Sequence, residues 1–228
     1  MGEERINLFL GRPCGWGLEH PDVGTWCGKL AGELAASGQL AGMVTHVEQR
    51  PRIAMARNEL VKTFLATKCE WLLMIDPDMR PDITGECFFW TSLRLLQAVG
   101  VGLVGAPACA GPPGYNVNVF WANPDTGTIR HVTHEEAAGM TGIERVPAVG
   151  TGLVLASRET FQRVPPPWFV DEMKDKEHTK LRYSQDVGFC LKARQYGVPV
   201  FVNWACWAGH QKAHLVGKPD GRQLPIVL

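Results

Sequence analysis

Two aspartates separated by a single proline follow a short run of apolar residues. The run is Trp71–Ile75 and the acids are Asp76 and Asp78, within the sequence WLLMIDPDM. Neighbouring carboxylates repel each other, and a divalent cation that prefers oxygen ligands relieves the repulsion. Ligands of open parallel sheets bind beyond the carboxyl ends of the strands. The position after an apolar run therefore predicts a metal and ligand site, and the alternative is an ordinary turn rich in Asp and Pro.

Two later segments carry residues that could take part in binding or catalysis. Ser184 and Asp186 open a segment with helical spacing, where Ser184 suits the N-cap and Asp186 suits the positive end of the helix dipole. Asp186 is also a candidate general base. Gly150-Thr151-Gly152 would let the backbone pass close to a ligand, and it is equally compatible with a bulge or a tight turn.

The first 105 residues must position the two aspartates. Apolar runs and helical spacing alternate along this part of the chain, which predicts a parallel sheet covered by helices on both faces. The expected strands are Ile6–Leu10, Val44–Val47, Trp71–Ile75 and Val101–Gly105, and the expected helices are 25–37, Ile53–Thr67 and 81–98.

The second half has a different pattern. A hairpin is expected around residues 123–127, which join two short β-rich runs. The expected strands are Val117–Trp121, Thr128–Val132, Val146–Val149, Leu153–Ala156 and Val198–Val202, with one helix from Ser184 to Tyr196. Because no linker separates the halves, we expect one domain over residues 1–228, with the halves meeting near residue 105 and sharing one mixed sheet.

Composition narrows the classes of partner. Lys and Arg number 23 and so do Asp and Glu, so the formal charge is zero and no global field attracts nucleic acid or membranes. The seven cysteines form no CxxC pair, which indicates free thiols in a reducing compartment. The first residues do not have the pattern of a signal peptide, and no apolar run approaches the length of a membrane span. We expect a cytoplasmic protein without a membrane partner.

Five short motifs, taken in order, resemble the GT-A family of metal-dependent, nucleotide-sugar glycosyltransferases. The ordered set spans residues 6 to about 214 and is most similar to the small bacterial and phage members of that family. The motifs are Ala56-Arg57-Asn58, the stretch from Trp71 to Asp78, Gly150-Thr151-Gly152, Ser184-Gln185-Asp186 and Ala208-Gly209-His210. The resemblance implies an α/β fold of the GT-A type, a Mn²⁺ or Mg²⁺ ion and a nucleoside diphosphate sugar, with a UDP-sugar preferred.

The resemblance also implies roles for single residues. Asp78 should ligate the metal directly, with His210 preferred over His214 as the ligand from the C-terminal region, and Asp76 should contact the ribose or the metal shell. Arg57 should lie near the base or the diphosphate. Contacts to the sugar or the acceptor are expected from Gly150, Thr151, Gly152 and, within the segment 165–183, Trp168. In inverting members, an acid at the position of Asp186 takes the proton of the acceptor hydroxyl.

Other functions remain open at this point. A nucleotidyltransferase also places acids after a buried strand, but the stretch Gly11–Gly17 has one basic residue where a triphosphate needs more. A non-enzymatic sugar-binding module is a second alternative. The acceptor is expected to be a saccharide, and a hydroxymethylated DNA base is a minority hypothesis that depends on a local basic surface from Arg12, Arg50, Arg52 and Lys174–Lys180.

Overall fold

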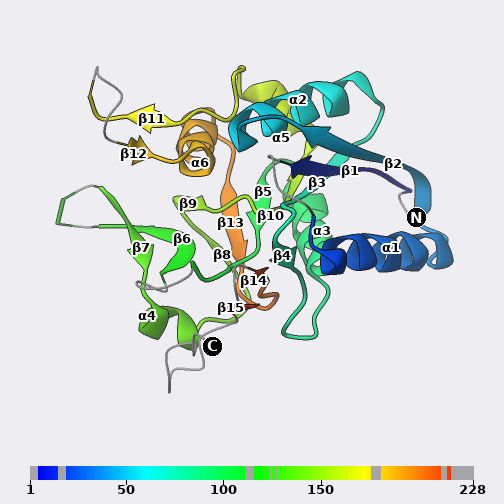
Figure 1. The fold of residues 1–228 in the computed structure, drawn as a ribbon, viewed down its shortest axis with the longest axis horizontal. Helices are drawn as coiled ribbons and strands as arrows, with labels where there is room; N and C mark the ends of the chain where they lie inside the picture. The colour runs from blue at the N-terminus through cyan, green and yellow to red at the C-terminus, as the bar shows by residue number, and fades with distance from the viewer. Residues whose placement is uncertain are drawn as a thin grey trace.

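A seven-stranded mixed sheet forms the centre of the protein (Figure 1). The computed structural model describes residues 5–14, 19–110, 116–123, 125–126, 128–175, 181–211 and 215–216. The strands lie in the order β2-β1-β3-β10-β5-β13-β8. Their bounds are β1 Ile6–Cys14, β2 Leu40–Gln49, β3 Trp71–Ile75, β5 Leu103–Gly105, β8 Ile143–Arg145, β10 Leu153–Ser157 and β13 Val200–Asn203.

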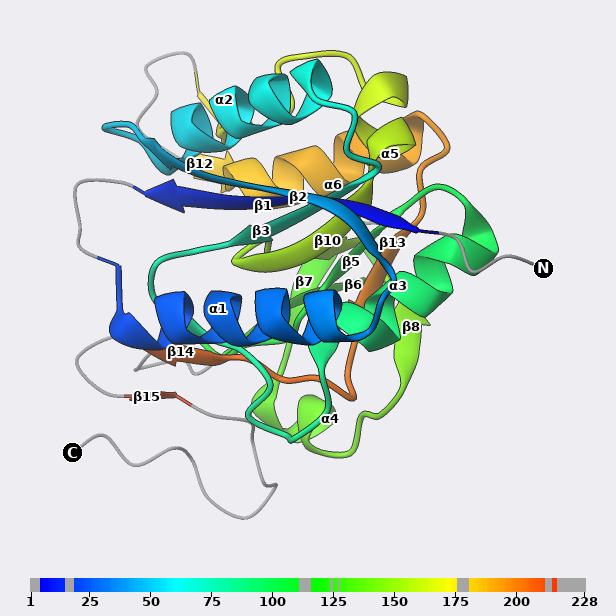
Figure 2. The same ribbon diagram turned by 90° about the vertical axis from the view of Figure 1, so that its right-hand side faces the viewer.

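Helices cover both faces of this sheet (Figure 2). α1 (Pro21–Ala36) and α3 (Phe88–Val99) bury their apolar residues in one core, and α2 (Ile53–Ala66), α5 (Arg158–Arg163) and α6 (Gln185–Gln195) contribute to the other. Side chains of a strand alternate between faces. Leu8 and Leu10 accordingly belong to the first core, whereas Phe9 between them belongs to the second. Burial on both faces explains why β1 and β3 read as apolar runs without alternation.

The first three strands are parallel, with β1 paired to β2 on one side and to β3 on the other. The connection through α1 leads from β1 outward to β2, and the connection through α2 returns across β1 to β3. Right-handed crossovers in opposite directions place their helices on opposite faces, as Figure 2 shows. The strand order reverses at β1, so the carboxyl ends of β1 and β3 form a topological switch point, where open α/β sheets bind ligands.

The second half contributes to the same sheet, as the sequence predicts, but only in part. β10 runs antiparallel between β3 and β5, and β13 and β8 extend the sheet beyond β5. The predicted hairpin forms, but it pairs with β9 in a separate sheet instead of joining the main one. The elements outside the main sheet are β4 Met79–Arg80, β6 Val117–Ala122, β7 Ile129–Val132, α4 His134–Ala138, β9 Ala148–Val149, β11 Glu172–Met173, β12 Leu181–Tyr183, β14 Gly209–Gln211 and β15 Leu215–Val216.

The prediction of a helix over 81–98 is wrong at its start, because α3 begins at Phe88. Asp82 adopts a left-handed backbone conformation, with φ 57°, and Gly85 has φ 88°. The Asp82 carboxylate accepts hydrogen bonds from the Trp26 indole, at 2.6 Å, and from the Phe88 backbone N–H, at 2.7 Å. These bonds stabilise a turn over the residues before Phe88 and satisfy a free N–H at the helix start. The short helices α4 and α5 were not predicted.

Two further expectations from the sequence concern the cysteines and membrane-spanning segments. All seven cysteines are free, and six of them are buried. Among the residues that the structure describes, no helix is both long enough and apolar enough to cross a membrane.

Candidate functional site

One cavity of about 340 Å³ gathers most of the predicted site residues at the carboxyl end of β3. Its lining includes Arg57 from α2, Asp76 and Asp78 after β3, Asp186 from α6 and His210 from β14. The other lining residues are Ile53, Met79, Ala108, Ala110, Asn118, Gly150, Gly152, Ser184 and Gln185. The fold therefore brings together side chains that are distant in the sequence.

Asp76 is held by Arg57. A single guanidinium nitrogen, Nη2, donates to both carboxylate oxygens, at 2.8 Å and 2.6 Å, and the Arg57 side chain is only 3% exposed. Burial raises the pKa of Asp76, the Arg57 charge lowers it, and the neighbouring carboxylate of Asp78 raises it again. A guanidinium remains charged in proteins, and an isolated cation would not be buried in this way. We therefore describe the two residues as a buried ion pair.

Asp78 and His210 meet because β4 pairs with β14. His210 lies opposite Met79 in this pairing, and the Gln211 N–H donates to the Asp78 carbonyl at 2.7 Å. His210 Nε2 lies 3.1 Å from Asp78 Oδ2. The other ring nitrogen, Nδ1, lies 3.2 Å from the Cys109 carbonyl oxygen. A carbonyl only accepts, so Nδ1 carries the hydrogen. A neutral ring then places two acceptors, Nε2 and Asp78 Oδ2, 3.1 Å apart, which a cation between them would stabilise, whereas a protonated ring would donate to Asp78.

The separation of these two atoms fits a divalent cation. Neighbouring ligands of an octahedral ion at about 2.1 Å lie about 3.0 Å apart, which is close to the distance between His210 Nε2 and Asp78 Oδ2. Within the described part of the chain, no group of three or more His, Cys, Asp or Glu side chains is arranged to hold a metal ion. Asp78 and His210 can therefore supply two ligands, and the others would come from substrate oxygens and water, as is usual for Mg²⁺ sites.

Asp186 lies in the first turn of α6. Its Oδ1 accepts hydrogen bonds from the Ser184 hydroxyl and, at 2.9 Å, from the Val187 N–H. Ser184 occupies the N-cap as predicted, but its side chain binds Asp186 and makes no capping hydrogen bond. Asp171 supplies a bond to the helix start instead, since its Oδ1 accepts from the Gln185 N–H at 2.9 Å.

The glycines allow close packing around the acids. A Cβ on Gly150 would lie 2.6 Å from Asn118 Nδ2, and a Cβ on Gly152 would lie 3.1 Å from Met79 Sδ and 3.4 Å from Asp76 Oδ2. Both glycines line the cavity. Thr151 between them is fully buried and is not part of the lining, so its predicted contact with a ligand has no support from its position.

Trp168 lies in surroundings that are typical of a core residue. It is 5% exposed, and its indole N–H donates to the carbonyls of Phe161, at 3.1 Å, and Val164, at 2.8 Å. Its ring packs edge-on against Phe161. Trp168 does not line the cavity with the acids, and it belongs instead to the lining of a larger hollow. His214, the alternative ligand to His210, lies outside the described residues.

Two polar residues of the cavity have no role in the sequence-based predictions. In the sequence, only its position next to Asp186 indicates that Gln185 could reach the site. Asn118 comes from the hairpin strand β6, and its Oδ1 accepts from the Ala108 N–H at 2.7 Å. Nothing local distinguishes Asn118 from any other polar residue of an exposed hairpin, because the contact depends on how the second sheet packs.

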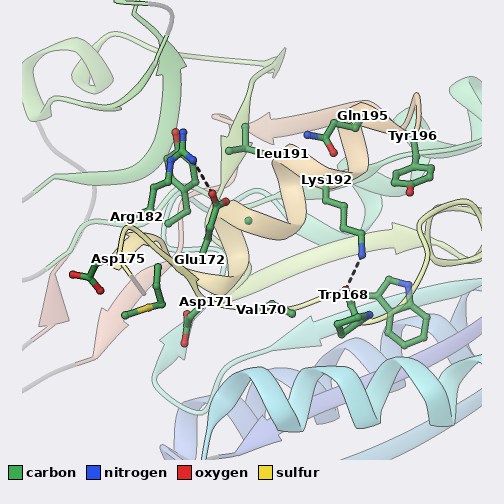
Figure 3. A pocket seen from close by; sticks show the side chains of 14 residues that line it. Trp168, Val170, Asp171, Glu172, Asp175, Arg182, Leu191, Lys192, Gln195 and Tyr196 are labelled. Carbon is green, nitrogen blue, oxygen red and sulfur yellow. Dashed lines mark hydrogen bonds and ion pairs between the residues drawn. The ribbon is translucent and has the colours of Figure 1, made fainter. Parts of the chain in front are cut away.

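A larger hollow of about 730 Å³ lies on another face of α6 (Figure 3). Gly188, which lines it, follows Asp186 by two residues, or about 200° around the helix. Glu172 and Arg182 form an ion pair there at 3.0 Å, and Lys192 Nζ donates to the carbonyls of Pro165 and Pro167. The hollow does not contain the aspartate and histidine set, so we place the chemistry in the smaller cavity.

Comparison with known proteins bears on the fold. No family model and no curated protein matches the chain. Among solved structures, the chain is similar to A197 from STIV, with a TM-score of 0.58, 16% sequence identity and coverage of 98% of both chains. It is also similar to GalNAc-T7, solved with UDP, GalNAc and Mn²⁺, with a TM-score of 0.53 and 14% identity. That alignment covers 97% of this chain and 46% of the GalNAc-T7 chain, so this chain spans less than half of that protein's length.

These similarities, together with the mixed sheet and its covering helices, define an α/β fold of the GT-A type. The fold class predicted from the sequence is confirmed. At these identities the similarity concerns the fold alone.

Proposed function

We propose that the protein is a metal-dependent glycosyltransferase that moves a sugar from a nucleoside diphosphate donor to a hydroxyl group of an acceptor. One observation carries the proposal. The pair Asp78–His210 and the acid Asp186 line a single cavity beyond the carboxyl end of β3 in a GT-A fold. Asp78 and His210 would bind the cation that accompanies a diphosphate, and Asp186 would act as the base.

Asp78 Oδ2 and His210 Nε2 are the atoms that would hold Mn²⁺ or Mg²⁺, and Asp76 would contact the donor ribose or the metal shell. A cation bound there supplies charge neutralisation for the departing diphosphate. Support for the metal and for UDP comes from GalNAc-T7, which was solved with UDP and Mn²⁺. Arg57 holds Asp76 in place and would lie beside the ribose and diphosphate.

Asp186 would take the proton of the acceptor hydroxyl as the acceptor oxygen bonds to the anomeric carbon and the bond to the diphosphate breaks. The two hydrogen bonds to Asp186 fall on Oδ1, and we therefore assign the proton to Oδ2. A single displacement of this kind inverts the anomeric centre. A base must lie within hydrogen-bond reach of the acceptor hydroxyl. Gly150 and Gly152 leave room for the ligands beside the backbone.

The proposal also covers the domain organisation and the cellular environment of the protein. Residues 1–228 would form one domain, with a donor half to about residue 105 and an acceptor half after it. The seven free cysteines favour a reducing, cytoplasmic environment. The similarity to small bacterial and phage glycosyltransferases remains a prediction.

The acceptor is proposed to be a saccharide. A DNA base gains little support, because Arg12 and Arg50 are paired with Glu19 and Glu48 and so do not form the basic surface that a phosphate backbone needs. Most of Lys174–Lys180 lies outside the described residues.

Thermal unfolding with nucleotides tests the proposal directly. A ligand that binds only the folded protein raises the melting temperature. We expect UDP with Mn²⁺ to raise it by several degrees, and UDP with EDTA to raise it much less. If no nucleoside diphosphate shifts the melting temperature in the presence of Mn²⁺ or Mg²⁺, the proposed function is wrong.

A further inference from the structure

Ser184 occupies the N-cap of α6, but its hydroxyl does not cap the helix. An N-cap serine ordinarily accepts a hydrogen bond from one of the first backbone N–H groups of its helix. The Ser184 hydroxyl makes no such bond and instead donates to Asp186 Oδ1, two residues later. Both residues are half-buried, and both line the cavity. The hydroxyl therefore acts on a carboxylate of the candidate site.

Other side chains bind the backbone at the start of α6. The Gln185 N–H donates to Asp171 Oδ1 at 2.9 Å, and the Val187 N–H donates to Asp186 Oδ1, also at 2.9 Å. The first N–H groups of a helix have no partner within the helix and need acceptors from elsewhere. Because two of them have acceptors here, the Ser184 hydroxyl is available for a different partner.

Asp171 is held beside the helix by the segment that precedes it. The Phe169 N–H donates to Asn58 Oδ1 of α2 at 3.1 Å, and the Phe169 carbonyl accepts from Asn58 Nδ2 at 2.7 Å. Lys192 Nζ of α6 donates to the Pro167 carbonyl at 2.9 Å. The acceptor that replaces the serine at the start of α6 therefore comes from a segment that is tied to both helices.

Two donors on one oxygen restrict the orientation of the Asp186 carboxylate. The Ser184 hydroxyl and the Val187 N–H both bind Oδ1, so a partial rotation of the carboxylate would weaken both bonds. Hydrogen bonds to an ionised group are stronger than those between neutral groups. We propose that Ser184 is a positioning residue for Asp186, because its hydroxyl holds Oδ1 and so keeps Oδ2 available to the acceptor hydroxyl. This inference rests on the proposed function, in which Asp186 is the base.

A purely structural role for Ser184 predicts a different result from a positioning role. Thr133 provides the comparison, since it is the N-cap of α4 and its hydroxyl accepts from the Glu136 N–H at 3.2 Å. Loss of a capping bond lowers stability. Thr133→Ala should therefore lower the melting temperature and leave catalysis unchanged. Ser184→Ala should do the reverse, because no backbone N–H loses its acceptor.

The test combines three measurements on Ser184→Ala, Asp186→Asn and the double variant. The first is kcat for UDP release with water as the acceptor, screened with UDP-glucose, UDP-galactose, UDP-GlcNAc and UDP-GalNAc in Mn²⁺ and then measured with the donor that the wild type hydrolyses fastest. The second is the affinity for UDP with Mn²⁺, and the third is the melting temperature. Ser184→Gly repeats the test without the hydroxyl if Ser184→Ala is unstable, because glycine is also accepted at an N-cap.

For Ser184→Ala we expect kcat to fall about tenfold to 100-fold, because a misplaced catalytic group slows a reaction by such factors. The affinity for UDP with Mn²⁺ should be unchanged. In the Asp186→Asn background, Ser184→Ala should cause no further loss, because the hydroxyl acts only through the Asp186 carboxylate.

The inference is overturned if Ser184→Ala releases UDP as fast as the wild type does. It is equally overturned if Ser184→Ala lowers kcat by the same factor with and without Asp186→Asn, since Ser184 would then act independently of the acid. Asp186→Asn with the wild-type rate would assign the base to another residue and remove the inference with it. Failure of the wild type to release UDP from all four donors would instead reject the proposed function.

Discussion

His210 Nε2 lies 3.1 Å from Asp78 Oδ2, although the two residues are 132 positions apart in the chain. The pairing of β4 with β14 sets this distance, and the contact of Nδ1 with the Cys109 carbonyl orients the ring so that Nε2 faces Asp78. The contact joins the residues that follow β3 to strand β14, which lies near the C-terminal end of the described residues.

The first prediction concerns metal affinity. His210→Asn removes one of the two proposed protein ligands, and we expect the Mn²⁺-dependent affinity for UDP to fall about 100-fold, or about 2.7 kcal/mol. Calorimetry with Mn²⁺ and UDP measures the loss. His46→Asn is the control, because His46 lies on the edge strand β2 and pairs with Glu48. Equal affinity in wild type and His210→Asn would remove His210 from the metal site.

The second prediction separates binding from chemistry. Asp186→Asn keeps the shape of the side chain and removes the proposed base, so transfer should slow by about 10² to 10⁴, while UDP should still bind with Mn²⁺. Single-turnover transfer and UDP affinity, measured side by side, test both parts. Glu135→Gln, an acid in the first turn of α4, serves as the control. Unimpaired transfer by Asp186→Asn would assign the base to another residue.

The third prediction concerns the ion pair between Arg57 and Asp76, which line the cavity. Arg57→Met leaves the Asp76 carboxylate without its cation, and loss of one partner of a buried pair costs about 3 to 5 kcal/mol in the free energy of unfolding. Urea unfolding should show this loss, and the double variant Arg57→Met, Asp76→Asn should recover a substantial part of it. Additive losses in the double variant would mean that the two side chains act independently.

The fourth prediction is a pH dependence away from the site. Hydrogen bonds from Arg130 and from the Thr133 N–H lower the pKa of Glu136 from its ordinary value of 4.5 to about 2. A lowered pKa stabilises the folded state above the unfolded-state pKa, and this contribution declines as the pH falls toward 2.

Glu136 lies near the surface and closes a capping box at the start of α4, so screening limits its contribution to about 1 kcal/mol. Glu136→Gln should therefore lower the free energy of unfolding by about that amount at pH 7, and the difference from the wild type should shrink between pH 4.5 and pH 3. A difference that stays constant over this range would show that the charge of Glu136 is not responsible.

Local sequence patterns were sufficient for the parts of the fold that local forces determine. Trp71–Ile75 was predicted as a strand with its correct bounds, because five apolar residues in a buried parallel strand need no partner to be recognised. The start of α3 was missed, because the Asp82 turn depends on the indole of Trp26, 56 residues earlier. The insertion of β10 between β3 and β5 is likewise decided by packing between distant segments.

The site residues also divide into those that the local sequence identifies and those that depend on distant contacts. Asp76 and Asp78 could be identified from their position after a strand, whereas Asp186 and His210 depended on the family resemblance to give them a role. Trp168 was assigned to a sugar because aromatic residues often stack on sugars, but the carbonyls of Phe161 and Val164 hold its indole in the core. Asn118 reaches the cavity only through the packing of a second sheet, which no local pattern encodes.

Asn58, the residue after Arg57, contacts the segment that leads to the start of α6. Its side-chain oxygen accepts from the N–H groups of Trp168 and Phe169, and its nitrogen donates to the Phe169 carbonyl. Arg57 and Asn58 are consecutive on α2, so one turn of a single helix orients Asp76 on one side and braces the approach to Asp186 on the other. One turn of α2 therefore contacts both walls of the cavity, so a change in the width of the cavity would require changes in α2 as well as in the lining residues.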